Sequence, residues 1–395
     1  MSKVIMIGCD LHDRSMLLRY AVDTDEPRQD SFNNDKGGRS RLIRHFLALQ
    51  KQVGAERIVM VYEASGQGFG LCDLLNDNGI ECHVLSPTLL PKTPKSAKLK
   101  TDARDAQMLL EQVRGHVLAG NRLPVVWTPP QRLRDDRELV RARIDTGDEI
   151  TRVKLQILSA LKRRGINKPT WYTTRWSKRF LKWLRQQTSE IDAVVGVMLE
   201  NLVCRYESYH QEKLRLNRAL RQLSQTPRYK DAHAELRKLP GIGLLAGMTF
   251  LTEMGDLTRF HNRREVAAYL GLCPSSFESG ESNNRKGRIT RQGPSRLRKI
   301  LCQSAWVALI HCDETAAMYH RIKGGKSNRT KKALVALMRK LAIKMWHAAL
   351  AAGVDSALEG RGGPHALAAS APAPPKGGVA TFASPPIQPQ TAGAG

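Results

Sequence analysis

The chain has 395 residues, of which 41% are hydrophobic, and this length is enough for about two to three folded domains. Its 63 Lys and Arg residues outnumber the 37 Asp and Glu residues, and the net charge of +26 indicates a polyanionic partner, with nucleic acid as the first candidate and a basic but unrelated enzyme as the alternative. Seven scattered cysteines that are never spaced as CxxC argue against a zinc site or a disulfide framework, and no apolar run approaches the roughly 18 residues that a membrane span requires.

Strand and helix patterns alternate over the first part of the chain. The N-terminus enters an apolar strand pattern at once instead of a signal peptide, so we expect a cytoplasmic protein. Apolar alternation predicts a strand hairpin and two further strands, over residues 4–9, 16–22, 58–62 and 82–85. Helical spacing predicts three helices, over residues 38–53, 68–78 and 102–113. This order predicts an α/β domain in which helices pack on a mixed sheet.

Long, charged helices follow the turn at Thr128, Pro129 and Pro130. Apolar residues recur at helical spacing over residues 131–165 and again over 176–223, where Thr188 and Ser189 interrupt the pattern. Charged residues cover the polar positions of both segments. We therefore expect an antiparallel helical hairpin that serves as an assembly arm and not as a catalytic unit.

The segment over residues 236–260 resembles a helix-hairpin-helix motif. Gly241 and Gly243 lie between two apolar helical runs, where a turn of small residues can bring the backbone and a helix N-terminus close to DNA phosphates. A plain connection between two helices explains the same residues and stays open. Farther along, residues 331–350 have the spacing of an amphipathic helix, and the Ala, Pro, Gly and Ser composition of residues 364–395 predicts disorder.

Four carboxylates carry the strongest chemical signal. Asp10 and Glu63 stand where apolar strands end, and Asp102 and Asp105 share one face at the start of a helix. Acids that converge from separate segments are typical ligands of Mg²⁺ or Mn²⁺, and such ions promote cleavage of phosphodiester bonds. Acids in the first turn of a helix also complement its dipole, which is the ordinary explanation for the second pair.

A cluster of lysines precedes the second pair of acids. Lys92, Lys95, Lys98 and Lys100 precede Asp102 and could bind a nucleic-acid backbone, although a solvated loop is the simpler interpretation.

Residues 271–299 combine small and hydroxyl side chains with a strongly basic run. Ser275, Ser276 and Ser279 are each candidate nucleophiles that chemistry alone does not separate, and a loop that only binds phosphate is equally compatible with the pattern. The basic residues that could neutralise developing charge are Arg285, Lys286, Arg288 and Arg291.

The order of the motifs resembles one family of insertion-sequence transposases. GCDLH, YEASG, KTDARDA, LPGIG, YLGLCPSSFESGESNNRKGRITRQG and ALVALMRKLA follow one another over about residues 3–352, as in the DEDD-type insertion-sequence family one-hundred-ten. The resemblance implies a ribonuclease H or RuvC-like α/β domain, an α-helical arm and a mostly α-helical C-terminal domain. The corresponding boundaries are 1–128, 129–228 and 229–353, followed by a tail over 354–395.

The resemblance also implies specific roles. It assigns Asp10, Glu63, Asp102 and Asp105 as the acidic tetrad that binds Mg²⁺ or Mn²⁺, and Ser279 as the nucleophile. Members of this family recombine donor and target DNA with a structured guide RNA and act as multimers, so we expect DNA, RNA and a homo-oligomer as partners. Two other functions stay open: a junction-resolving nuclease that uses metal-activated water, and a non-catalytic nucleic-acid-binding protein.

Overall fold

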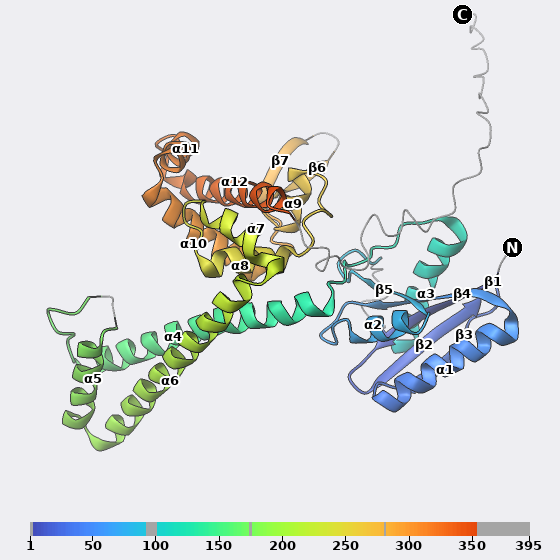
Figure 1. Cartoon of the computed structure of the whole chain (residues 1–395), viewed down its shortest axis with the longest axis horizontal. Coiled ribbons are helices and arrows are strands. Elements are labelled where there is room, and N and C mark those ends of the chain that lie inside the picture. Colours follow the sequence, from blue (N-terminus) through green and yellow to red (C-terminus); the bar gives the residue numbers. More distant parts are fainter. Residues whose placement is uncertain (1–2, 92–100, 174–175, 280–281, 354–395) are drawn as a thin grey trace, which may run out of the picture. The chain divides into compact units, whose positions relative to one another are not determined.

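A computed structural model describes residues 3–91, 101–173, 176–279 and 282–353, and for residues 276–286 it describes at most the backbone. The described chain forms two compact units, one ending at Val126 and the other beginning at Trp127 (Figure 1). Within the described part of the chain, no helix is long and apolar enough to cross a membrane.

The first unit is built on a five-stranded sheet. Its strands are β1 (Lys3–Leu11), β2 (Ser15–Val22), β3 (Arg28–Asn33), β4 (Ala55–Glu63) and β5 (Glu81–Leu85), in the order β3-β2-β1-β4-β5. β1 is antiparallel to β2 and parallel to β4, which in turn is parallel to β5. The mixed sheet that the sequence predicted is therefore confirmed. The sequence pattern did not indicate β3, because its residues RQDSFN are mostly polar and it forms a half-exposed edge.

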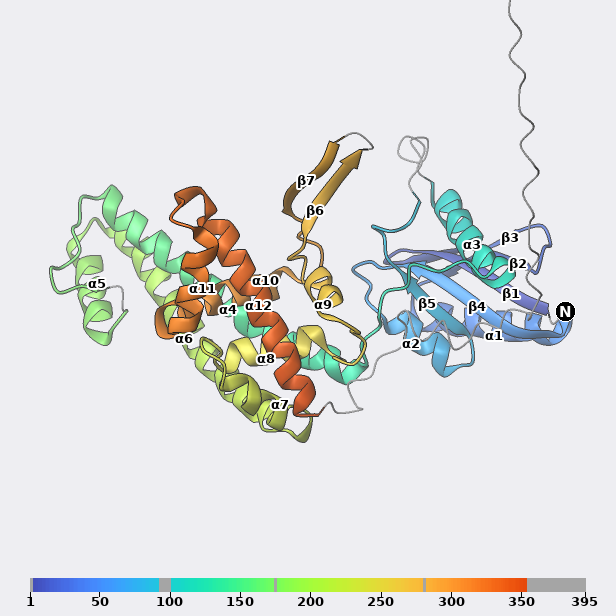
Figure 2. The same cartoon turned by 90° about the horizontal axis from the view of Figure 1, so that it is seen from above.

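Helices cover both faces of this sheet. α1 (Lys36–Val53) and α2 (Gly70–Asp77) pack on the face that carries Ile5 and Ile7. α3 (Asp102–Ala119) packs on the opposite face, which carries Val4 and Met6, and Figure 2 shows α1 and α3 on the two sides. Alternate residues of β1 thus enter two separate cores, as the period of a strand requires.

Gly8 allows α3 to lie directly on β1. A Cβ atom at this position would stand 2.3 Å from the carbonyl oxygen of Ala106 and 2.3 Å from the amide nitrogen of Leu110. Both are backbone atoms of α3, so only a residue without a side chain permits this approach. This contact fixes the distance between α3 and β1, and with it the position of the start of α3 relative to the end of β1.

The second unit begins with a helical arm. α4 (Gln131–Arg163) and α6 (Ala193–Ser224) lie side by side, and α5 (Lys178–Glu190) packs at their outer end (Figure 1). The break between α5 and α6 falls at Ile191 and Asp192, slightly after the expected Thr188 and Ser189. It falls there because the Asp192 side chain caps α6 by accepting a hydrogen bond from the Val194 amide at 3.1 Å.

The remaining α-helices and strands follow the arm in the chain. They are α7 (Pro227–Arg237), α8 (Leu244–Met254), α9 (Arg263–Tyr269), β6 (Pro274–Ser279), β7 (Ser282–Ile289), α10 (Ser295–His311), α11 (Asp313–Lys323) and α12 (Thr330–Ala351). A shared apolar core joins α4 to these helices. Two bidentate ion pairs reinforce the joint: Arg141 with Glu253 at 2.9 and 3.1 Å, and Arg228 with Asp136 at 2.9 and 2.8 Å.

The serine-containing segment forms a β-hairpin, although its Ser and Gly content favoured a loop. β6 and β7 pair in antiparallel register, and Ser279 pairs with Ser282 at the end of the ladder. Backbone pairing thus overrides the low strand propensity of these residues. The expected disorder of residues 364–395 lies outside the described residues.

Candidate metal centre and nucleic-acid interface

Asp10 and Glu63 lie at the same edge of the sheet. In the parallel pair of β1 and β4, Cys9 is opposite Tyr62, so Asp10 and Glu63 each follow by one residue. Glu63 is the last residue of β4 and is exposed, whereas the Asp10 side chain keeps 19% of its surface accessible. Carboxyl ends of parallel strands collect functional groups in this way.

Asp102 approaches Asp10 through a histidine that the sequence pattern did not indicate. The Nε2 atom of His12 lies 3.2 Å from an Asp10 carboxylate oxygen and 3.3 Å from an Asp102 carboxylate oxygen. One ligand atom from each of the three residues falls within 4.8 Å of the others. His12 follows Asp10 by two positions, and this spacing places both side chains on one face of an extended chain. That spacing was the signal that could have identified His12.

Polar contacts fix the turn that carries His12. The side-chain amide of Asn34 donates to the His12 carbonyl at 2.7 Å, and the His12 amide donates to the Ser15 carbonyl at 2.9 Å. Gln67, from the segment after β4, contacts both Asn34 and Asp13 through side-chain hydrogen bonds. The turn is thereby tied to β3 and β4 before any ligand binds.

The other two predicted acids stand outside this close group. Asp105 lies three residues after Asp102 on α3 and is half-buried, and its amide donates to the Thr101 carbonyl at 3.1 Å. Among the described residues, Asp10, His12 and Asp102 form the one group of three potential ligands at such short range. The structure therefore brings together Asp10 and Asp102, and leaves Glu63 and Asp105 nearby on the adjoining elements.

The donor set fits a hard divalent ion. Carboxylate oxygens suit Mg²⁺ and Mn²⁺, and an imidazole nitrogen is compatible with Mn²⁺. Cys9 does not join them. It is fully buried in the core, and this burial, together with the charge of Asp10, raises the pKa of its thiol, which keeps it protonated.

The three candidate serines differ in what the structure describes. Ser275 donates its hydroxyl hydrogen bond to the Arg288 carbonyl at 3.0 Å, a contact that favours a structural role. The side chains of Ser276 and Ser279 lie outside the described residues. The backbone of Ser279 forms the last position of β6, immediately before the turn of the hairpin.

The basic residues near this hairpin are described in part. Arg288 and Arg291 are exposed, and Arg291 adopts a left-handed backbone conformation with φ of 57°. Arg298 supports this turn by donating to the carbonyls of Gln292 and Gly293 at 3.0 and 2.9 Å. The side chains of Arg285 and Lys286 lie outside the described residues, as do Lys92, Lys95, Lys98 and Lys100.

The two glycines of the hairpin between α7 and α8 differ in role. A Cβ on Gly241 would stand 2.3 Å from the Ser304 carbonyl oxygen of α10, so this glycine is required for packing. Gly243 precedes α8 with no atom within 4 Å of its Cβ position and without a side-chain cap. Gly243 is therefore the position where a phosphate could approach the free amides of α8.

A basic pocket of about 410 Å³ lies beside the start of α8. Its lining combines the cationic and polar side chains of Arg221, Ser224, Gln225, His233 and Arg237 with the apolar Leu244. Burial, followed by the charge of Arg237, lowers the pKa of His233. An anion beside Gly243 would therefore meet a neutral His233 and two arginines at neutral pH.

Comparison with known proteins decides the family. A transposase model of the DEDD IS110 type matches residues 7–165, and a model described as Transposase IS116/IS110/IS902 family matches residues 233–321. The chain belongs to the IS110 family of DEDD transposases. The first match includes the Asp10, His12 and Asp102 group, and the second includes the β6–β7 hairpin.

Similar proteins carry related names. "Putative transposase y4qE" of Sinorhizobium fredii is 32% identical over 263 residues, which are 65% of this chain and 60% of that protein. The transposase for insertion sequence element IS1533 of Leptospira borgpetersenii is 22% identical over 78% of this chain and 86% of its own length. A pilin gene-inverting protein of Moraxella bovis is 28% identical over 116 residues, 29% of this chain and 36% of its own.

Proposed function

We propose that this IS110-family protein is a metal-dependent DNA transposase that cleaves and rejoins DNA during insertion and excision of a mobile element. The observation that carries the proposal is the approach of Asp10, His12 and Asp102 at one edge of the sheet, in the region matched by the DEDD model. The strand order β3-β2-β1-β4-β5, with helices on both faces, supports a RuvC-like fold for this domain. The net charge of +26 fits DNA as the substrate.

In this proposal Asp10 and Asp102, together with Glu63 and Asp105, hold Mg²⁺ or Mn²⁺. When bound, such an ion offsets the charge of a DNA phosphate and stabilises the leaving oxygen. His12, fixed by Asn34, orients the Asp10 and Asp102 carboxylates. Because His12 and Asp102 are exposed, a DNA backbone can reach them from solvent.

Ser279 is the proposed nucleophile. Its hydroxyl oxygen attacks a DNA phosphorus, gives up its proton to solvent and forms a serine–phosphate ester, while the bond to one deoxyribose oxygen breaks and that oxygen takes up a proton. The ester conserves the energy of the phosphodiester bond. A hydroxyl of the second DNA strand then attacks the same phosphorus, rejoins the DNA and releases Ser279. The reaction therefore needs no ATP.

The family resemblance supports two further parts of the proposal. A structured guide RNA pairs with donor and target DNA, and several copies of the chain assemble, so that the serine of one copy can act with the acids of another. The long arm formed by α4 and α6 supplies a surface suited to such assembly.

The proposal is tested with purified protein, Mg²⁺, the structured RNA encoded in the end of its own mobile element as the candidate guide RNA, and labelled donor and target DNA. Wild-type protein should give rejoined strands, and Asp10→Asn should give none while still binding DNA. Hydrolysed ends without rejoining would instead identify a junction-resolving nuclease. Unchanged products with Asp10→Asn would contradict the assignment of the metal site.

A further inference from the structure

The outer end of the arm carries an unusually basic stretch. Residues 150–189 contain eleven Lys or Arg residues and no Asp or Glu. Arg175 lies outside the described residues, and among the other ten Arg152 pairs with Glu149 and Arg185 with Glu207. Within the described part of the chain no carboxylate pairs with the remaining eight, which are Lys154, Lys162, Arg163, Arg164, Lys168, Lys178, Arg179 and Lys182. Residues 166–232 fall between the two family matches, so neither match covers six of these eleven basic residues, whereas the other five, up to Arg164, lie inside the first match.

Aromatic side chains accompany these charges and pack against one another. Phe180 is fully buried, and its ring lies 4.3 Å from Tyr172, 5.1 Å from Trp176 and 5.4 Å from Trp183, measured between centroids. The three surrounding rings are half-buried: each packs against the core of the arm and keeps part of its surface accessible. Binding at these rings would cost little conformational entropy.

Cations lie over the faces of the same group of rings. The Arg179 guanidinium lies 4.1 Å from the centre of Trp171, the Lys168 amine 5.0 Å from Tyr172, and the Lys154 amine 5.3 Å from Trp176. Arg179 is exposed, so its planar group stays accessible to solvent while it lies over Trp171. Nucleobases stack on both arginine planes and aromatic rings of this kind.

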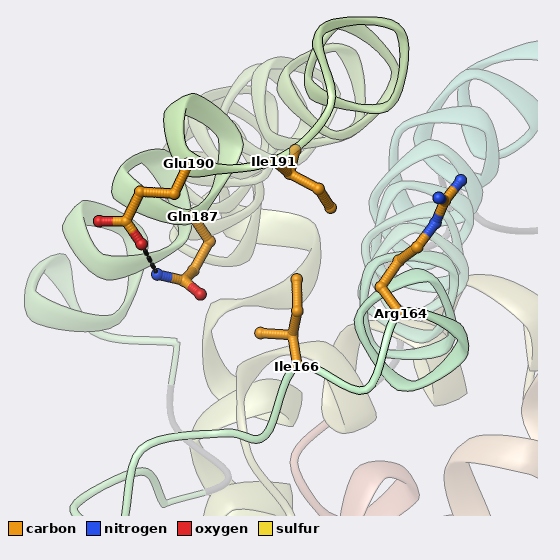
Figure 3. A pocket seen from close by; sticks show the side chains of 5 residues that line it. All are labelled: Arg164, Ile166, Gln187, Glu190 and Ile191. Carbon is orange, nitrogen blue, oxygen red and sulfur yellow. Dashed lines mark hydrogen bonds between the residues drawn. The ribbon is translucent and has the colours of Figure 1, made fainter.

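A pocket of about 290 Å³ adjoins this surface between the end of α4 and the connection from α5 to α6. Figure 3 shows Ile166 and Ile191 pointing toward one another across it, with Arg164 and Gln187 at its sides. Glu190 completes the lining and accepts a hydrogen bond from Gln187 at 2.9 Å. Two apolar walls with donor and acceptor groups at the edge can hold one planar base that has left its neighbours.

We propose that the outer end of the arm binds an unpaired nucleic-acid strand, with phosphates on the exposed Lys and Arg residues and bases stacked on Arg179 and the half-buried rings. An acidic protein would use the charges but not the rings. A duplex keeps its bases paired and stacked, so it would use only the charges. This inference goes beyond the proposed function, because it requires neither Ser279 nor a metal ion.

The test measures binding of fluorescent probes of about 20 nucleotides, namely an unstructured RNA, the same sequence as single-stranded DNA, and duplex DNA, with the full chain and a metal chelator. The test variant carries Lys178→Gln, Arg179→Gln and Lys182→Gln, three exposed positions on α5. The matched control carries Lys331→Gln, Lys332→Gln and Lys340→Gln, three exposed positions on α12. Circular dichroism verifies that both variants stay folded.

The α5 variant should bind single strands at least about tenfold more weakly at about 0.1 M salt. The salt slope, which is the slope of the logarithm of the binding constant against the logarithm of the salt concentration, should fall in magnitude by about 2, because each phosphate contact contributes about 0.7. The α12 control should lose much less, and duplex binding should fall less than single-strand binding. Arg179→Lys keeps the charge but not the plane, so it should weaken binding at an unchanged salt slope. A preference for RNA or DNA identifies the source of the strand.

Two results would overturn the proposal. One is single-strand binding by the α5 variant equal to that of wild type. The other is an equal loss for the α5 and α12 variants with single strands and duplex alike, which would indicate unspecific attraction by net charge. Because the metal-dependent reaction is measured separately, either result leaves the proposed function to its own test.

Discussion

Gly8→Ala is the substitution that tests how the fold positions the candidate metal site. The new methyl group would stand 2.3 Å from the Ala106 oxygen and the Leu110 nitrogen, where an ordinary contact is at least 3.4 Å. Because both atoms belong to the backbone of α3, the helix must move by about 1.1 Å, the difference between these distances. Overpacking of this kind costs about 1–3 kcal/mol of unfolding free energy.

The same movement carries Asp102 away from Asp10 and His12. A displacement of about 1 Å in a positioned group can cost about 100-fold in activity, so metal-dependent DNA cleavage should fall far more than stability alone requires. Calorimetric unfolding measures the first effect, and titration with Mn²⁺ together with the cleavage assay measures the second.

Gly70→Ala is the matched control in the same unit. Gly70 begins α2, has no atom within 4 Å of its Cβ position and has no positive φ, so alanine there should leave stability unchanged or raise it slightly. An unfolding midpoint and Mn²⁺ affinity of Gly8→Ala equal to those of Gly70→Ala would refute the argument that α3 needs this glycine.

Three further predictions concern the site and the joint of the arm. Asn34→Ala should weaken Mn²⁺ binding in calorimetric titration without loss of fold, because it removes the hydrogen bond that fixes the turn carrying His12. An unchanged Mn²⁺ affinity would show that the turn keeps its conformation without Asn34. Arg228→Ala should cost about 3 kcal/mol in urea unfolding because it removes the cation beside the buried Asp136 carboxylate and leaves it with the uncharged Tyr229 hydroxyl, whereas Arg296→Ala, which breaks an exposed pair with Asp145, should cost less than about 1 kcal/mol; equal costs would contradict this. Burial lowers the pKa of His233 below its ordinary value of 6.5, so the unfolded state binds more protons and the free energy of unfolding should fall as the pH drops below about 6.5. His233→Gln should flatten this pH dependence. Parallel curves of unfolding free energy against pH for wild type and His233→Gln would exclude His233 as its source.

Much of the first unit follows from its sequence pattern. The β1–β2 hairpin, β4, β5 and the three covering helices have strong apolar periodicity, and the structure places them close to the expected residues. The sequence pattern did not predict β3, because an edge strand with polar residues on both faces has no apolar periodicity. β3 is a strand because its backbone pairs with β2, and this pairing exists only in the folded sheet.

The candidate site was predictable in part. Asp10 and Asp102 were identified from their places at the ends of elements, but their approach depends on Gly8, whose role only the packing of α3 reveals. His12 was overlooked because a single histidine beside a turn has no sequence signal beyond its spacing from Asp10. Gly241 packs closely against α10, a contact that the sequence did not indicate because glycine permits close backbone approaches of many kinds; its predicted contact with a DNA phosphate stays a prediction.

The most direct test of the central claim is a search for a covalent link between protein and DNA. Wild-type protein, Ser279→Ala and Asp10→Asn are each incubated with Mg²⁺, the candidate RNA and labelled DNA, and the label is followed on a denaturing gel. The account predicts label attached to the wild-type protein alone, and only when the metal ion is present. Label attached to Asp10→Asn protein, or rejoined DNA from Ser279→Ala protein, would contradict it.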